Sequence, residues 1–207
     1  MRRSLARFMA VPVAAAGASA VALFAASPAF AQGVTDTGGS AAITTPFSYI
    51  AALAKAHIAE VPLPPATVSV DTSAQTVTTT FPVTGGDADT GTLSGALDVG
   101  GTLKVLSLQH RHLYQVTLTN IAVSLDSDAI VATPQGSNTQ VPLLDIGGDV
   151  TVTQGTNQSL TSDDLSVDPA GAAYLDKALH TSAFQNAVTA GVNTGSLNAS
   201  WTISTTG

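Results

Sequence analysis

The 207-residue sequence contains no cysteine, and only 10% of its residues are charged. Without cysteine the chain has no disulfide, no thiolate nucleophile, no iron–sulfur cluster and no cysteine-based zinc site. The sequence has seven basic and 14 acidic residues, so it lacks the basic surface that nucleic-acid binding requires. Aromatic residues are scarce at 5%, but a hydrophobic fraction of 44% is sufficient for a folded core.

The first 31 residues have the three-part pattern of a secretory signal peptide. Three arginines within the first seven residues precede an apolar stretch over residues 11–26, and an Ala-Phe-Ala cleavage motif ends at Ala31. No other stretch has the length and apolar character of a membrane span. We therefore expect cleavage after Ala31 and a protein that is secreted or held in the cell envelope, not membrane-spanning, with four basic residues, 14 acidic residues and a net charge of −10.

The rest of the chain predicts a mainly β domain. Residues 32–42 are rich in Gly, Ser and Thr and are expected to form a flexible leader before a single domain over residues 43–207. Val/Thr alternation, interrupted by turn residues every 8 to 12 positions or so, predicts an antiparallel sandwich or barrel of about nine to eleven short strands. The expected strands are 67–71, 76–81, 91–99, 103–109, 114–119, 122–125, 129–132, 140–146, 149–153 and 196–204.

Two accessory helices are expected. One follows Thr45-Pro46 and covers residues 47–58, and the other is capped by Asp168 and begins at Pro169, with a further short helical turn over residues 182–188. The first helix has two apolar faces. On a helical wheel, one face is predicted to pack on the core, and it consists of Phe47, Ile50, Ala51, Ala54 and Ile58. Tyr49 lies on the opposite face, beside Leu53 and Ala56.

The segment over residues 106–114 concentrates reactive side chains, namely His110, Arg111, His112 and Tyr114. In an extended strand the two histidines and the tyrosine share one face with Leu106 and Leu108 because side chains alternate. Two histidines spaced as H-x-H are compatible with zinc, but no third ligand is evident. A surface hairpin with solvated histidines is the simpler interpretation of this segment.

Other chemistries have less support. There is no G-x-S-x-G motif of a serine hydrolase, and Glu60 is the single glutamate, which argues against a glycosidase with paired carboxylates. Acidic stretches at 86–90 and 162–164 are either calcium-binding loops or solvated turns, and the absence of a spaced D-x-D-x-D-G loop favours turns. We expect no catalytic residue and no metal other than the iron considered next.

Three blocks of the sequence together resemble the HtaA family of exported haem-binding domains from actinobacteria. The first block is the start of the first helix, Thr45-Pro46-Phe47-Ser48-Tyr49-Ile50. The second is His110 followed by the strand over residues 113–120. The third is the Ala-rich helix over 169–175 with Phe184 and the glycine-containing turn that leads to Trp201.

This resemblance implies a non-enzymatic function, the capture of ferric haem through a tyrosine ligand. The family's iron ligand falls on Tyr49, and its histidine that hydrogen-bonds the phenolate falls on His110, with His112 as the alternative because Arg111-His112 replaces the family's Asp-Gly turn. Arg111 and Lys55 are the candidate partners of the haem propionates. Haem, and haem-transfer proteins of the cell envelope, are the implied partners. The alternative hypothesis is a structural or adhesive cell-envelope β-domain without a small-molecule ligand.

Overall fold

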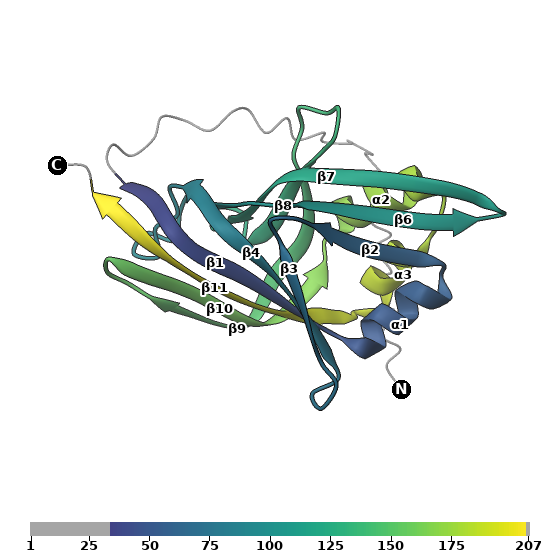
Figure 1. The fold of residues 1–207 in the computed structure, drawn as a ribbon, viewed down its shortest axis with the longest axis horizontal. Helices are drawn as coiled ribbons and strands as arrows, with labels where there is room; N and C mark the ends of the chain where they lie inside the picture. Colours follow the sequence, from purple (N-terminus) through teal and green to yellow (C-terminus); the bar gives the residue numbers. More distant parts are fainter. Residues whose placement is uncertain (1–33, 206–207) are drawn as a thin grey trace, which may run out of the picture. The chain divides into compact units, whose positions relative to one another are not determined.

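The computed structural model describes residues 34–205, so the predicted signal peptide lies outside the described residues. The described part contains eleven strands and three helices (Figure 1). In chain order they are β1 (Val34–Pro46), α1 (Phe47–Lys55), β2 (Ile58–Leu63), β3 (Thr67–Asp71), β4 (Thr76–Gly86), β5 (Ala96–Val99), β6 (Thr102–Gln109), β7 (His112–Ser124), β8 (Ala129–Pro134), β9 (Val141–Thr153), β10 (Asn157–Val167), α2 (Pro169–Leu179), α3 (Ala183–Ala190) and β11 (Asn193–Thr205).

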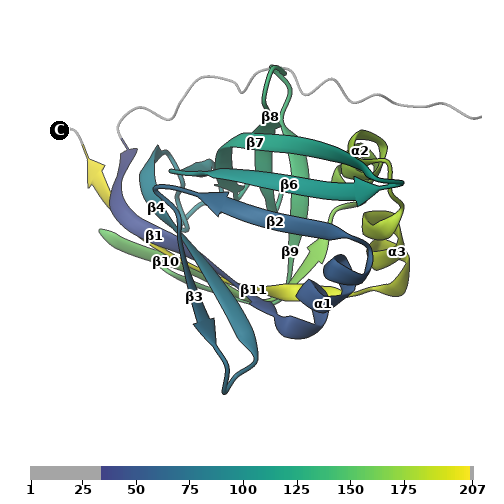
Figure 2. The same ribbon diagram turned by 45° about the vertical axis from the view of Figure 1, so that its right-hand side comes forward.

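Eight of these strands close into an antiparallel barrel. Hydrogen-bonded neighbours follow the order β7-β5-β4-β1-β11-β10-β9-β8, and β8 pairs with β7 to close the ring. Three strands lie outside the ring and form two wings: β3 pairs with β4, whereas β6 pairs with β7 and carries β2 on its other side (Figure 2). The predicted mainly β class is confirmed.

The wings exist because β4 and β7 are much longer than the strand between them. β5 has four residues and pairs with residues 83–86 of β4 and residues 121–124 of β7. Beyond β5 the remaining part of β4 pairs with β3, and the remaining part of β7 pairs with β6. The wall between β4 and β7 is therefore complete at one end of the barrel and divided into two wings at the other.

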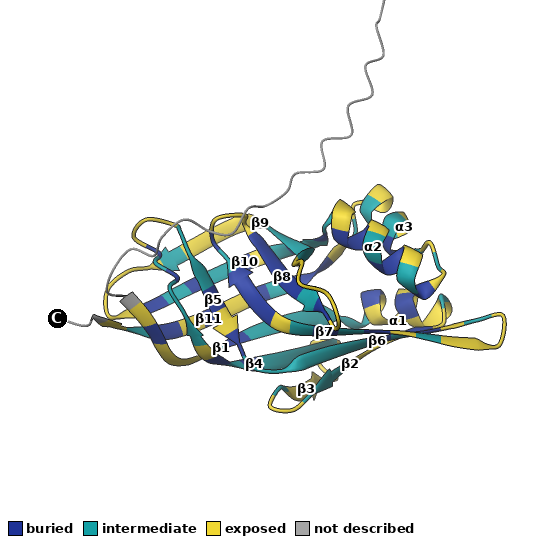
Figure 3. Ribbon diagram, turned by 90° about the horizontal axis from the view of Figure 1, so that it is seen from above, coloured by how far each residue is buried: buried dark blue, intermediate teal, exposed yellow. Residues whose placement is uncertain are grey.

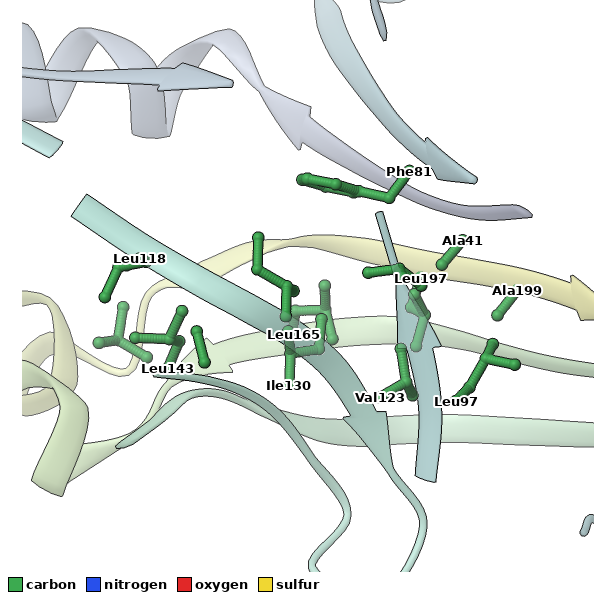
Figure 4. Packing of buried hydrophobic residues seen from close by; sticks show 14 of the residues in the cluster. Ala41, Phe81, Leu97, Leu118, Val123, Ile130, Leu143, Leu165, Leu197 and Ala199 are labelled. Atoms are coloured by element: carbon green, nitrogen blue, oxygen red, sulfur yellow. The ribbon is translucent and has the colours of Figure 1, made fainter. Parts of the chain in front are cut away.

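The core fills the barrel interior. Alternate side chains of β11, namely Leu197, Ala199 and Trp201, are buried and show the period of two expected of a strand with one face inside. They meet Leu97 and Leu165 from other strands (Figure 4). The burial-coloured view shows the same alternation of buried and more accessible positions along the strands (Figure 3).

The second predicted helix is confirmed, including its cap. The Asp168 carboxylate accepts hydrogen bonds from the backbone N–H groups of Ala170 (2.6 Å) and Gly171 (2.9 Å), and Pro169 begins α2. These contacts satisfy two of the donors that a helix start leaves free. A third helix, α3, extends the short helical turn that the sequence suggests.

The first helix differs from its prediction in length and orientation. α1 ends at Lys55, and the chain re-enters the sheet as β2 from Ile58. Tyr49 and Leu53 are the buried residues of α1, whereas Ala51, which belongs to the face predicted to pack on the core, is exposed. The predicted orientation of this helix is therefore wrong. The apolar face that carries the phenol of Tyr49 packs on the barrel.

The first strand occupies most of the segment that the sequence predicts as a flexible leader. Residues 34–42 belong to β1, which pairs with β11 from its start and with β4 from Ser40 onward. The glycines that suggest flexibility form a bulge here, because the register with β11 shifts between Thr37 and Gly39. A Cβ at Gly39 would lie 2.0 Å from the Ser200 carbonyl oxygen, so a close strand approach explains this glycine.

Within residues 34–205 we find no helix with the length and apolar character required to cross a membrane.

Candidate functional site

A cavity of about 350 Å³ lies inside the divided end of the barrel. This volume is at the lower end of the range of roughly 300 to 1,000 Å³ that small-molecule sites occupy. Its wall is mostly aliphatic and aromatic, with contributions from the barrel strands, both wings and all three helices. The polar side chains in the wall are Thr45, Thr79, Thr194, Tyr49 and Glu60.

Tyr49 reaches this cavity from the first turns of α1. The start of the helix is fixed to the β3–β4 turn by a hydrogen bond from the Phe47 N–H to the Gln75 carbonyl oxygen (2.9 Å). The side chain of Tyr49 is only 6% exposed, and no hydrogen-bond partner for its hydroxyl is found among the described residues. Burial raises the pKa of Tyr49, and the negative charge of Glu60 raises it further. In the free protein Tyr49 is therefore a neutral phenol at physiological pH.

Glu60 reaches the same cavity from β2. Strand alternation places it on the inner face with Ile58 and Pro62, and all three line the cavity. The residue is partly exposed, and desolvation by the neighbouring apolar wall raises the pKa of its carboxyl group to about 7. Glu60 and Tyr49 are the two ionisable side chains of this wall. No motif in the sequence marks Glu60 as a site residue.

The predicted site residues of the β6–β7 hairpin lie elsewhere. Gln109 and His112 form the last pair of the hairpin, and His110 and Arg111 make its two-residue turn with φ of 50° and 69°. Positive φ at both central residues is what a type I′ turn requires. Neither histidine lines the cavity, and no contact joins either of them to Tyr49 within residues 34–205. Their assignment as hydrogen-bond donors to the phenolate stays a prediction from the resemblance.

The hairpin instead places the aromatic ring of Tyr114 beside two histidine rings. The ring of Tyr114 stacks on His180, which ends α2, with 4.2 Å between ring centroids. The ring of His112 is tilted against that of Tyr114, with 6.5 Å between the centroids. The predicted propionate partners are also separated from the cavity wall. Arg111 is exposed in the hairpin turn, and Lys55 is exposed in the last turn of α1.

The acidic stretches organise turns. Asp87 accepts a hydrogen bond from the Ala96 N–H (3.0 Å), Asp89 accepts one from the Gly91 N–H (2.8 Å), and Asp163 accepts one from the Asp149 N–H (2.8 Å). No group of three or more His, Asp or Glu residues suited to hold a metal ion is found in the part of the chain that the structure describes.

Comparison with known proteins identifies a related fold. The crystal structure of the C-terminal domain of HtaA from Corynebacterium glutamicum matches with a TM-score of 0.54 and 15% sequence identity, covering 82% of this chain and 99% of that domain. The two chains share a fold. No family model matches the chain, and no curated protein matches it. The resemblance to HtaA is thus confirmed for the fold, and membership of the family stays a prediction.

Proposed function

We propose that this protein binds ferric haem outside the membrane through Tyr49 and catalyses no reaction. The observation that carries the proposal is the environment of Tyr49. This buried phenol lines a mostly apolar cavity, and its hydroxyl has no hydrogen-bond partner among residues 34–205. The fold shared with the C-terminal domain of HtaA supports it. The sequence resemblance to the HtaA family assigns the iron ligand to the same residue.

The residues of the cavity suit such a ligand chemically. Ferric iron is a hard Lewis acid, and tyrosine is one of the axial ligands that proteins offer to haem iron. The raised pKa of Tyr49 means that the free phenol keeps its proton until a metal replaces it. The aliphatic wall excludes water from one side of this position. Bound haem would supply the ferric centre, and Tyr49 would hold it.

The surrounding roles rest on the resemblance alone. His110 and His112 as hydrogen-bond donors, and Arg111 and Lys55 as propionate partners, are carried over by sequence position. The hairpin and the end of α1 present these side chains on the surface. Export from the cell follows from the predicted signal peptide. The alternative of a structural or adhesive domain without a ligand gains no support from a cavity that contains two ionisable side chains.

A hemin titration of three matched variants tests the proposal. Wild-type protein should give the high-spin ferric spectrum of tyrosine-ligated haem. Tyr49→Phe should lose it, because the substitution removes one oxygen and retains the packing of the ring. Tyr174→Phe, which removes a half-buried phenol of α2 that does not line the cavity, should retain it. Unfolding curves of the variants provide the control for folding.

Two results would contradict the proposal. If wild-type protein leaves the absorption of free hemin unchanged, the domain has no haem site and the structural alternative is preferred. If Tyr49→Phe retains the wild-type spectrum, the ligand is another residue, and Tyr114→Phe is the next variant to measure.

A further inference from the structure

The β6–β7 hairpin reaches beyond α1 and ends in an exposed apolar pair (Figures 1 and 3). Leu108 and Leu113 face each other across the two strands, so both side chains lie on the same face of the hairpin. Their exposed fractions are 51% and 66%. The side chains of Leu106 and Ala59 follow on the same outward face. These exposed leucines are not part of the barrel core, and neighbouring exposed apolar side chains are a feature of interaction surfaces.

Positive charge gathers at the same end. Three of the four basic residues of the described chain lie on the elements that meet there: Lys55 in α1, Arg111 in the hairpin turn and Lys177 in α2. Two contacts show that these elements meet, since the Leu108 N–H donates to the carbonyl oxygen of His57 (3.0 Å) after α1, and Tyr114 stacks on His180 after α2. The sequence has no acidic residue between Asp98 and Asp126 or after Asp176.

Negative charge gathers at the opposite end of β7. The strand runs 13 residues from His112 to Ser124, roughly 40 Å at about 3.3 Å per residue. Asp126 follows it and accepts a hydrogen bond from the Gly95 N–H (3.2 Å), which connects it to the turn that carries Asp87. The domain is thus acidic overall, and three of the four cationic side chains of residues 34–205 lie on the elements of the hairpin end.

We propose that the hairpin end docks on an anionic lipid surface. Leu108 and Leu113 would enter the boundary between headgroups and acyl chains, while Arg111 in the turn and Lys55 at the end of α1 would lie at the level of the phosphates. Exposed apolar side chains beside cations are the combination that interfacial binding uses. A protein partner is less well suited to this tip, because a stable protein interface covers about 800 Å² on each side, far more than two leucines provide.

Vesicle flotation of the chain without residues 1–31 tests the proposal, since the described domain has its own core. Binding is expected to vesicles of phosphatidylcholine with about one third phosphatidylglycerol, to be absent from pure phosphatidylcholine, and to fall at about 1 M salt. Arg111→Gln should lower the partition coefficient about fivefold. Asn138→Asp, which changes net charge equally in an exposed loop, should leave it within about twofold.

A local probe separates insertion from an effect on folding. Trp201 is the single tryptophan and is buried, so Leu113→Trp adds an accessible reporter. Its fluorescence should be quenched by brominated lipids, whereas that of Leu93→Trp, at another exposed leucine away from the hairpin, should not. The double variant Leu108→Ser, Leu113→Ser should bind at least about tenfold more weakly than wild type.

Three results would overturn the proposal: equal binding to neutral and anionic vesicles, no quenching of Leu113→Trp, or a dimer in solution that the double variant abolishes, which would assign the leucines to a second copy. None of these measurements uses haem, so the proposed function and this inference stand or fall separately.

Discussion

Asp36 provides the sharpest test of the electrostatics of this barrel. Its side chain is 2% exposed, one carboxylate oxygen accepts a hydrogen bond from the Ala88 N–H (2.8 Å), and the other oxygen is buried without a partner among the described residues. Burial raises the pKa of Asp36 from 3.8 to about 6, and the charges of Asp87, Asp98 and Asp89 add to the rise. The folded state therefore holds the proton of Asp36 more tightly than the unfolded state does.

The direction of the pH effect follows from this difference. Asp36 contributes most to the free energy of unfolding when its carboxyl group is protonated. This contribution is lost as the pH rises from about 4 to about 6. A rise of about two pKa units corresponds to about 3 kcal/mol as an upper value. Asp36→Asn keeps an acceptor for the Ala88 N–H and removes the charge, so it should raise the free energy of unfolding by about 1–3 kcal/mol at pH 7.5 and have little effect near pH 4.

Urea unfolding at several pH values measures this effect. The matched control is Asp149→Asn, which removes one charge from an exposed carboxylate. In a thermal melt at pH 7.5, the melting temperature of Asp36→Asn should exceed that of the control by about 2–4 °C for each kcal/mol. Two results would refute the raised pKa of Asp36. The first is equal stability of the two variants at pH 7.5. The second is a wild-type stability that increases steadily between pH 4 and pH 7, with the same slope in Asp36→Asn.

The sequence correctly predicted those elements that are determined by a few neighbouring residues. β3 has the predicted bounds, 67–71, because Val/Thr alternation and flanking turns are sufficient to define a hairpin strand. The start of α2 was also predicted correctly, since Asp168 and Pro169 act on the backbone directly after them. The closure of the barrel was not predictable in the same way, because β1 pairs with β4 and β11 over long sequence separations.

Besides β1, whose residues suggested a flexible leader, β2 and β10 were missed because their residues resemble loop residues. β2 contains Pro62, a residue that is rare inside strands. As an edge strand that pairs only with β6, β2 tolerates a residue without an N–H. β10 contains Asp163 and Asp164, which suggested an acidic loop but lie at a register shift in the strand. Missing β2 also concealed Glu60, whose inward position follows only from the alternation Ile58-Glu60-Pro62.

The remaining predictions concern the hairpin and the packing of α2. If the resemblance assigns the role of His110 correctly, His110→Ala should weaken hemin binding about 10- to 100-fold. A larger effect of His112→Ala would transfer that role to His112. Negligible effects of both substitutions would exclude the hairpin from the haem site. Arg111→Ala should raise the hemin Kd only severalfold and leave the visible spectrum unchanged, because an exposed ion pair is worth about 1 kcal/mol or less. Gly171→Ala tests how α2 is held. A glycine replaced by alanine inside a helix usually gains up to about 1 kcal/mol, but here the added Cβ would lie 2.0 Å from the Pro142 carbonyl oxygen and 3.2 Å from the Leu143 Cα, both backbone atoms of β9. Because neither atom can rotate away, α2 must move off β9, and we expect a loss of about 2 kcal/mol or more in the free energy of unfolding. Ala173→Gly, at an exposed position of the same helix, should cost about 1 kcal/mol through propensity alone. If Gly171→Ala proved as stable as wild type in the same urea titration, α2 would not pack on β9 at this distance.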